Sequence, residues 1–332
     1  MRNLLLISAL LFVEIISFAQ PVVYPSSFIV AKDGSGNFKT IQEAINAVRD
    51  LSEQTVKIFI KKGVYIEKVV VPTWKTNISL IGEDKDSTII SWNDYSGKLY
   101  TNGKDAYGKD KFSTFTSYTL LVQGNDFTAN NITIQNTAGR VGQAVALHVE
   151  GDRCIIENCR LLGNQDTLYT ATSGSRQYYK ACFIEGTTDF IFGEATAVFD
   201  HCVIRSLVNS YISAASTRPG QKYGYVFLNC KLIADTAAKK VYLGRPWRPY
   251  ARTVYINTEM GSHILREGWE NWRNPDNEKT AYYAEYNSKG SGANAAGRVK
   301  WSRQLSKKEA EEYTLKNIFE GCGGWIPFLN DK

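Results

Sequence analysis

The chain has 332 residues, enough to bury a large core, and its 39 lysines and arginines against 33 aspartates and glutamates give a formal net charge of +6. The basic residues are spread along the sequence without a basic run, so nucleic acid is not expected as a partner. A mildly basic balance of this kind fits an acidic polymer as a partner, and it fits a generic soluble surface equally well.

The first 19 residues have the layout of a cleaved signal peptide. Arg2 precedes an apolar run over residues 4–18, and the run ends in small residues at Ala19. Because this run is shorter than the roughly 20 residues that a membrane span needs, a transmembrane anchor is disfavoured. We expect cleavage after Ala19, secretion to the periplasm or outside the cell, no membrane attachment afterwards, and a monomer formed by one domain over residues 20–332.

The first predicted elements of the mature chain are a helix and three strands. Residues 40–48 carry apolar side chains at helical spacing after a glycine-rich turn, as expected of a helix that caps the first coil of a solenoid. Residues 56–60, 78–81 and 119–122 are strand-like, and turns that contain glycine separate them.

Residues 127–235 contain a block that recurs every 20 to 28 residues, the length of one solenoid coil. Each block is predicted as a short alternating strand. In a parallel β-helix one position of the block would stack inward, with successive coils about 4.8 Å apart: Ile132, Cys159, Cys182, Cys202 and Cys230. The cysteines would act as small apolar core residues, although a disulfide between neighbouring rungs remains open.

A second helical segment lies near the end of the chain, at residues 306–319. Ser306 is its predicted N-cap, and Glu309 three residues later completes a capping box. A solenoid needs caps because its end coils otherwise expose apolar edges. The sequence therefore predicts an all-β fold, a single-stranded right-handed parallel β-helix with short capping helices at its ends.

Polar residues occur at unusual places, within apolar or aromatic sequence. They are Gln143 in QAVAL, Gln165 and Asp166 in QDTLY, Asp189 in DFIFG, and Arg245 in LGRPW. No histidine pair has metal-ligand spacing and no Gly-x-Ser-x-Gly motif is present, so we expect neither a metal, nor another cofactor, nor a serine nucleophile.

The two aspartates are separated by about one coil, which would bring their carboxylates within a few ångströms of each other. Two carboxylates at that range cannot easily both ionise. One would hold a proton while the other stays anionic, and Arg245 would favour the anion. One residue type would thus supply both an acid and a nucleophile. A buried aspartate bonded only to the turns of the solenoid is the structural alternative.

These blocks resemble the pectin methylesterase family, and they occur in the family's order. The matching segments cover nearly the whole mature chain: residues 31–36, 40–42, 63–67, 143–147, 165–169, 189–193, 243–247 and 285–287. The resemblance implies that the substrate is the methyl ester of galacturonate in pectin.

The resemblance also implies a role for each polar residue. Asp189 would be the nucleophile, Asp166 the general acid and then the general base, and Arg245 the partner that holds Asp189. Gln143 and Gln165 would donate to the oxyanion of the intermediate, a contribution on the order of 3 kcal/mol per donor in comparable sites.

By the same resemblance, Trp247 and Phe192 would border the sugar groove and Thr114 would contact substrate, although aromatic residues in a β-helix more often serve packing. Three residues depart from the family's pattern: Asn164, Thr188 and Glu194. None of them removes a catalytic group, but they leave the subsite preference and the pH optimum open.

Other functions remain as alternatives. A pectate lyase or polygalacturonase could share the fold and the polymer, but glycosidic cleavage needs no oxyanion hole and a calcium-dependent lyase needs a cluster of carboxylate ligands. A noncatalytic carbohydrate-binding solenoid would not require two aspartates and two glutamines in register with Arg245. A related esterase acting on another acyl or methyl-uronate substrate is harder to exclude.

Overall fold

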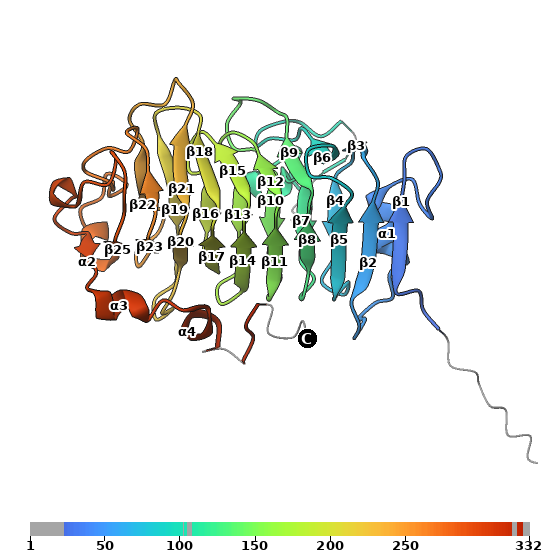
Figure 1. Ribbon diagram of the computed structural model, residues 1–332. Coiled ribbons are helices and arrows are strands. Elements are labelled where there is room, and N and C mark those ends of the chain that lie inside the picture. Colours follow the sequence, from blue (N-terminus) through green and yellow to red (C-terminus); the bar gives the residue numbers. More distant parts are fainter. Residues whose placement is uncertain (1–22, 102, 105–107, 321–323, 328–332) are drawn as a thin grey trace, which may run out of the picture.

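The computed structural model describes residues 23–101, 103–104, 108–320 and 324–327, which form a parallel β-helix (Figure 1). Each complete coil contributes one strand to each of three parallel sheets, which wrap around a common apolar core. The predicted parallel β-helix is confirmed. The predicted signal segment, residues 1–19, lies outside the described residues.

The largest sheet in the described residues, sheet A, has eleven strands in the order β1 (Ser27–Val30), β2 (Val56–Ile60), β5 (Ile78–Gly82), β8 (Thr128–Asn130), β11 (Cys154–Glu157), β14 (Arg176–Lys180), β17 (Thr196–Asp200), β20 (Tyr225–Leu228), β23 (Arg252–Ile256), β25 (Tyr282–Tyr286) and β26 (Arg303–Gln304). Sheet B consists of β3 (Gly63–Ile66), β6 (Thr88–Trp92), β9 (Thr133–Asn136), β12 (Arg160–Leu162), β15 (Phe183–Gly186), β18 (Val203–Ser206), β21 (Lys231–Ala234) and β24 (Glu259–Met260). Sheet C consists of β4 (Val69–Val71), β7 (Leu120–Val122), β10 (Leu147–Val149), β13 (Leu168–Thr170), β16 (Ile191–Gly193), β19 (Tyr211–Ala215) and β22 (Tyr242–Pro246). The early strands predicted from the sequence correspond to β2, β5 and β7.

The repeated block of the sequence is a corner followed by a strand, and its prediction as a strand throughout was wrong for its first two residues. The chain turns from sheet A to sheet B through one residue with positive φ, where asparagine is tolerated better than most residues. These corner residues are Asn131, Asn158, Ala181, His201, Asn229, Asn257 and Asn287. In the first of the predicted blocks the strand begins only at Thr133, two residues after the corner.

The predicted inward ladder is present directly after these corners. Ile132 and the four cysteines at 159, 182, 202 and 230 are each at most 1% exposed. The cysteines are free thiols that donate to backbone carbonyl oxygens, as Cys182 Sγ does to Ile156 at 3.2 Å. The open question of a disulfide between these rungs is therefore answered: none of the five described cysteines forms one.

The helix at the start of the solenoid, α1 (Ile41–Ala47), caps the first coil as predicted. Thr40 and Glu43 form a capping box, which satisfies backbone N–H groups at the helix start. Ile41 and Ile45 are fully buried in the main core, and α1 packs against β1, β2 and β4. The apolar edge of the first coil is thus covered.

The predicted C-terminal helix is two helices, α3 (Lys307–Glu311) and α4 (Leu315–Phe319). The break occurs because Thr314 has extended backbone dihedrals and starts the second helix as its N-cap. Ile318 and Phe319 of α4 pack on Tyr178 and Val226, so α4 covers the outer face of sheet A and does not cap the end of the solenoid (Figure 1).

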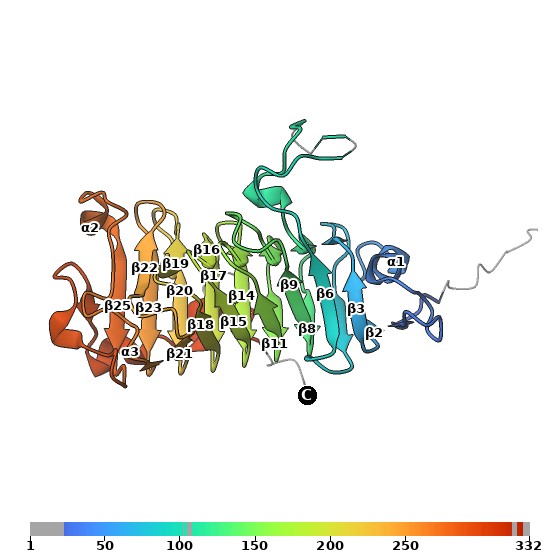
Figure 2. The same cartoon turned by 90° about the horizontal axis from the view of Figure 1, so that it is seen from above.

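The other helical turns are α2 (Asn277–Thr280) and the 3₁₀ turns η1 (Thr114–Thr116) and η2 (Ala295–Gly297). In the described ranges, no helix has the length and apolar character needed to cross a membrane. In the connection from β6 to β7, the described residues (93–101, 103–104 and 108–119) project from the solenoid as a long arm (Figure 2). Its η1 turn brings Thr114 back toward sheet C, where the candidate site lies.

Candidate active site

A cavity of about 210 Å³ lies along the outer face of sheet C. It is lined by all eight residues that the sequence singled out: Thr114, Gln143, Gln165, Asp166, Asp189, Phe192, Arg245 and Trp247. Three further residues complete the lining: Phe115, Ala214 and Trp272. The fold therefore gathers side chains that are up to 158 positions apart in the sequence (Thr114 to Trp272) around one cavity.

The two aspartates occupy equivalent positions on neighbouring coils. Leu168 of β13 pairs with Ile191 of β16, and each aspartate lies two residues before its paired strand residue. The backbone N–H of Asp166 donates to the carbonyl oxygen of Thr188, one residue before Asp189. Because adjacent coils are about 4.8 Å apart, the two carboxyl groups share the cavity as neighbours.

Both aspartates have left-handed backbone dihedrals, with φ of 65° at Asp166 and 50° at Asp189. Such dihedrals are uncommon outside glycine, although aspartate and asparagine adopt them more readily than other residues. They occur at the point where each coil enters sheet C, so the turns that hold the carboxyl groups are built into the solenoid.

Arg245 of β22 holds the carboxylate of Asp189 through two hydrogen bonds. Its Nε donates to Oδ1 at 3.0 Å and its Nη2 donates to Oδ2 at 2.7 Å. The guanidinium lies between two aromatic rings, with Cζ 3.8 Å from the centroids of both Tyr211 and Trp272. A planar cation fits this slot, and the stacking fixes the direction of the two hydrogen bonds.

Asp166 is in a different environment. It is 8% exposed, and its carboxyl group has no hydrogen-bond partner among the described residues. Burial, and then the negative charge of Asp189, raise the pKa of Asp166 well above its usual range, while Arg245 opposes the rise.

Burial also raises the pKa of Asp189, and here the hydrogen bonds and charge of Arg245 act in the opposite direction. The carboxyl that contacts Arg245 is therefore the one that loses its proton first, and Asp166 keeps its proton to higher pH. The pair thus supplies one anionic and one protonated carboxyl group in the same cavity.

Gln165 directly precedes Asp166, and Gln143 lies at the matching position of the preceding coil. Gln143 and Gln165 pair as an isolated parallel β-bridge, with the N–H of Ala144 donating to the carbonyl of Gln165 at 3.1 Å. Their backbones are thus fixed, and both residues line the cavity. No hydrogen bond joins either side-chain amide to another described residue, so both amides are available as donors to a bound molecule.

Aromatic side chains form a row along the cavity. The ring of Phe192 stacks on Tyr169 with centroids 4.5 Å apart, and Trp247 meets Phe192 edge-on at 5.8 Å. Phe115 lies 5.5 Å from Tyr169 on the side of the β6–β7 connection. Such surfaces can pack against the apolar face of a sugar ring.

A second cavity of about 350 Å³ adjoins the first and shares Trp247 with it. It contains Glu194, one of the three departures from the family's pattern, whose Oε2 lies 2.5 Å from Nε of Arg218. Thr188, the second departure, forms a hydroxyl contact with Ser210 at 2.8 Å, and Asn164, the third, accepts the N–H of Thr187 through its carbonyl. Only Glu194 therefore places a charge beside the candidate site.

Sequence reasoning missed Tyr211 and Trp272, which stack on Arg245, and Phe115, which lines the cavity. Trp272 and Tyr211 are 27 and 34 residues from Arg245, on other coils or connections. The sequence offers one signal for Trp272: it is a large aromatic residue in the polar segment ENWRN, where burial in the core is not expected. A tryptophan in such a segment is a candidate for a role outside the core.

One ion-paired carboxylate, one protonated carboxyl group and two free amides can together perform acyl transfer through an anionic intermediate. Within the described parts of the chain, no group of three or more histidine, cysteine, aspartate or glutamate side chains is arranged to hold a metal ion.

Comparisons with known proteins identify the family of the chain. The model of the Pectinesterase family matches residues 27–322. Pectinesterase 31 of Arabidopsis thaliana is 39% identical over 287 residues, which make up 86% of this chain and 89% of that protein. Several other curated relatives are longer, and the chain spans 48–53% of their length.

Solved structures give the same result. A pectin methylesterase from carrot has a TM-score of 0.80 and 36% identity, covering 91% of this chain and 95% of that one. A pectin methylesterase in complex with a hexasaccharide has a TM-score of 0.77 and 32% identity, covering 91% and 98%. The chain belongs to the pectinesterase family, which confirms the resemblance found in the sequence.

Proposed function

We propose that this chain hydrolyses the methyl esters of galacturonate in pectin, releasing methanol and leaving the polymer length unchanged. The observation that carries the proposal is the unequal aspartate pair. The carboxylate of Asp189 is held by Arg245, whereas the carboxyl group of Asp166 has no hydrogen-bond partner among the described residues, and both groups share the cavity with Gln143 and Gln165. Related proteins are named pectinesterases, and a related structure contains a hexasaccharide, which supports a polysaccharide substrate.

In the first half of the reaction, an oxygen of Asp189 attacks the carbonyl carbon of the methyl ester. The carbonyl oxygen becomes an oxyanion, to which the amides of Gln143 and Gln165 donate. As the tetrahedral intermediate collapses, Asp166 gives its proton to the departing methoxide oxygen. Methanol leaves, and Asp189 is joined to the galacturonate as an anhydride.

In the second half, Asp166 is ionised and accepts a proton from a water molecule. The water oxygen attacks the galacturonyl carbonyl of the anhydride, and the same two amides hold the new oxyanion. Collapse of this intermediate restores the carboxylate of Asp189 and releases the polymer with a de-esterified galacturonic acid residue, which loses its own proton to solvent. Asp166 has regained its proton, so both residues return to their starting states.

The test is incubation of the purified protein with highly methylated pectin while methanol release and polymer length are followed together. Methanol release at constant polymer length is the expected result. Shortened chains would identify a polygalacturonase, and products with new ultraviolet absorption would identify a lyase. Release of another acyl group, with methylated pectin left intact, would identify an esterase for a different substrate.

The proposal extends to the mature form of the protein. A signal peptide over residues 1–19, cleaved after Ala19, would deliver a one-domain monomer, residues 20–332, to the periplasm or the outside of the cell, where pectin would be its partner. The intact mass of the exported protein and its mass by light scattering test these statements. A mature mass that still includes residues 1–19 contradicts the cleavage, and a dimer contradicts the monomer.

A further inference from the structure

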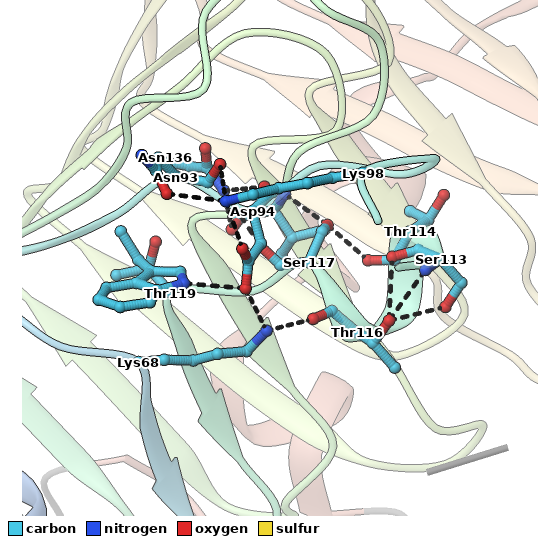
Figure 3. A network of polar contacts seen from close by, with 12 residues as sticks. Lys68, Asn93, Asp94, Lys98, Ser113, Thr114, Thr116, Ser117, Thr119 and Asn136 are labelled. Atoms are coloured by element: carbon cyan, nitrogen blue, oxygen red, sulfur yellow. Dashed lines mark hydrogen bonds and ion pairs between the residues drawn. The ribbon is translucent and has the colours of Figure 1, made fainter. Parts of the chain in front are cut away.

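A cluster of buried polar contacts joins the β6–β7 connection to the body of the solenoid (Figure 3). At its centre is Asp94, two residues after β6 and 3% exposed. Its Oδ2 accepts hydrogen bonds from Nζ of Lys68 and Nε1 of Trp92, both at 2.8 Å, and its Oδ1 accepts from Nζ of Lys98 at 2.9 Å. One carboxylate thus connects three segments of the chain.

Lys68 belongs to the solenoid body, between β3 and β4, and it contacts both ends of the connection. Besides Asp94 near the start, its Nζ donates to the carbonyl oxygen of Thr116 near the end, at 2.5 Å. The same ammonium lies 4.4 Å from the ring centroid of Phe112 and 4.6 Å from that of Tyr118. Lys68 and Asp94 together therefore close the base of the projecting arm.

Asn136, at the end of β9, fixes the arm to the segment that carries the first glutamine of the site. Its Nδ2 lies 2.9 Å from the carbonyl oxygen of Asp94 and 3.1 Å from those of Ser117 and Val145. The Oγ of Ser117 accepts from the N–H of Val145 at 3.2 Å and donates to the carbonyl of Thr114 at 2.8 Å.

These contacts bear directly on the cavity. Thr114 and Phe115, which line the cavity, immediately precede Thr116, whose carbonyl Lys68 holds. At the start of the arm, the N–H of Ser96 donates to the carbonyl of Gln143 at 2.9 Å. The wall of the cavity is therefore attached to the solenoid through Asp94 and its partners, none of which is among the residues lining the cavity itself.

The charges at this cluster depend on one another. The two lysines and Trp92 lower the pKa of Asp94 against the effect of burial, so the carboxylate stays anionic. Burial lowers the pKa of Lys68, and Asp94 opposes that change. Without the carboxylate, the ammonium groups of Lys68 and Lys98 would face each other at the base of the arm with no counter-ion. Their repulsion would disfavour the position of the arm that the structure shows.

We propose that Asp94 is a positioning residue that holds Thr114 and Phe115 against the cavity and thereby supports binding of the pectin chain. This inference rests on the proposed function and adds to it a group that touches neither the aspartate pair nor the amides. Asp94 acts through Lys68 and the Thr116 carbonyl, so its removal affects the position of the wall and leaves the reacting groups in place.

The test is Asp94→Asn, which keeps the side-chain volume and removes the charge. We expect KM for highly methylated pectin to rise about tenfold, with kcat changed by less than about threefold, because the wall contributes to binding and not to the reacting bonds. Hydrogen exchange should accelerate at the amides of Thr116 and Ser117 while the strands of sheets A and B keep their protection.

Asp152→Asn is the matched control. Asp152 also holds two cations, with Oδ2 2.6 Å from Nη2 of Arg176 and 2.9 Å from Nη1 of Arg153, but it lies away from the cavity. The control variant should lose thermal stability at unchanged KM. Lys98→Met removes only the contact of Lys98 with Asp94 and should raise KM about threefold. If Asp94→Asn does not fold, this variant tests whether the cluster supports binding.

Each of the other outcomes has a definite meaning. An unchanged KM in Asp94→Asn, or an equal rise in Asp152→Asn, overturns the proposal and leaves Asp94 a purely structural residue. A lower kcat at constant KM also overturns it, because the effect would then pass through Gln143. If the wild-type protein releases no methanol from pectin, the proposed function fails, while hydrogen exchange at Thr116 and Ser117 still decides whether Asp94 anchors the arm.

Discussion

Arg245 and Asp189 form a bidentate ion pair, with donor–acceptor distances of 3.0 and 2.7 Å, on the outer face of sheet C. The pair decides which of the two neighbouring aspartates is the anion. It also fixes the plane of the carboxylate, because the guanidinium is itself held between Tyr211 and Trp272. Arg245 thus determines both the position and the charge of the proposed nucleophile, Asp189.

Arg245→Lys should therefore not behave as a conservative change. Lysine keeps the positive charge, but it cannot make two parallel hydrogen bonds or fill the slot between two rings. We expect kcat on methylated pectin to fall about 100-fold or more, with the fold retained. Arg248→Lys is the control, because Arg248 is exposed on Trp247 and does not contact Asp189. Near-normal turnover in Arg245→Lys would show that charge alone is sufficient.

The two amides make a second prediction. Gln143→Ala and Gln165→Ala should each lower kcat about 100-fold, because each removes one donor to the oxyanion and leaves the aspartate pair intact. Gln123→Ala serves as the comparison: its amide donates to Glu150 at 2.9 Å, outside the cavity, and turnover should stay normal. Full activity in either of the first two variants means that the amide does not face the reacting carbonyl.

The raised pKa of Asp166 predicts a change in stability with pH. A carboxyl group whose pKa is higher in the folded than in the unfolded protein stabilises the fold fully below its unfolded pKa of about 4. This contribution is lost as the pH rises through the folded pKa, because the proton that folding favours is then released.

Asp166→Asn, which cannot ionise, should therefore melt at a higher temperature than the wild type at pH 7. The gain arises because burial of the ionised Asp166 costs the wild type free energy of folding that the neutral amide does not cost. The difference should shrink toward zero near pH 4. Thermal melts of both proteins across this range provide the test, and a constant difference at all pH values would contradict it.

A buried ion pair near the end of the solenoid predicts a large loss of stability on mutation. Arg298 Nε donates to Oε1 of Glu285 at 2.6 Å, and its Nη1 donates to the carbonyl of Leu265 at 2.9 Å. Both side chains are at most 3% exposed. Arg298→Met should lower the free energy of unfolding by about 3–5 kcal/mol, because it leaves the carboxylate of Glu285 buried without its cationic partner.

Denaturant titration measures this change, and Lys307→Met is its control. Lys307 pairs with Glu311 at 3.8 Å on the surface, where both side chains are largely exposed, so the loss should be below about 1 kcal/mol. Equal losses in the two variants would mean that burial of the Arg298 pair is not what matters.

Sequence patterns predicted the five polar residues of the site because they lie in short motifs whose spacing follows the coil. Asp166 and Asp189 are one coil apart, and parallel pairing converts that separation into proximity. The aromatic partners of Arg245 follow no such rule. Tyr211 lies on the preceding strand of sheet C, and Trp272 lies in the irregular segment after β24, so only the folded chain brings them together.

The errors in the fold prediction have a physical cause as well. The blocks around Ile132 and the cysteines alternate in the way that strands do, yet their first residue turns a corner with positive φ. Alternation of apolar and polar residues shows which side chains point inward. A corner keeps the same inward and outward order, so the pattern does not distinguish a corner from a strand. The C-terminal helices carried helical spacing and caps, but spacing does not state which surface receives the apolar side.

The division of roles between the two aspartates leads to the last prediction, which concerns the residue that becomes attached to substrate. Asp189→Asn should give no acyl enzyme, because a neutral amide is a poor nucleophile. Asp166→Asn should impair both halves of the reaction on pectin, since it removes the proton donor and the later base. It still leaves the Asp189 carboxylate, held by Arg245 and free to attack.

An activated ester whose leaving group needs no protonation separates the two variants. After rapid acid quench, mass spectrometry should find the adduct on the peptide that contains Asp189 in Asp166→Asn, and no adduct there in Asp189→Asn. An adduct on Asp166 would reverse the roles. Normal hydrolysis without any adduct would favour direct attack by water, in which case Arg245 would hold Asp189 as a base and not as a nucleophile.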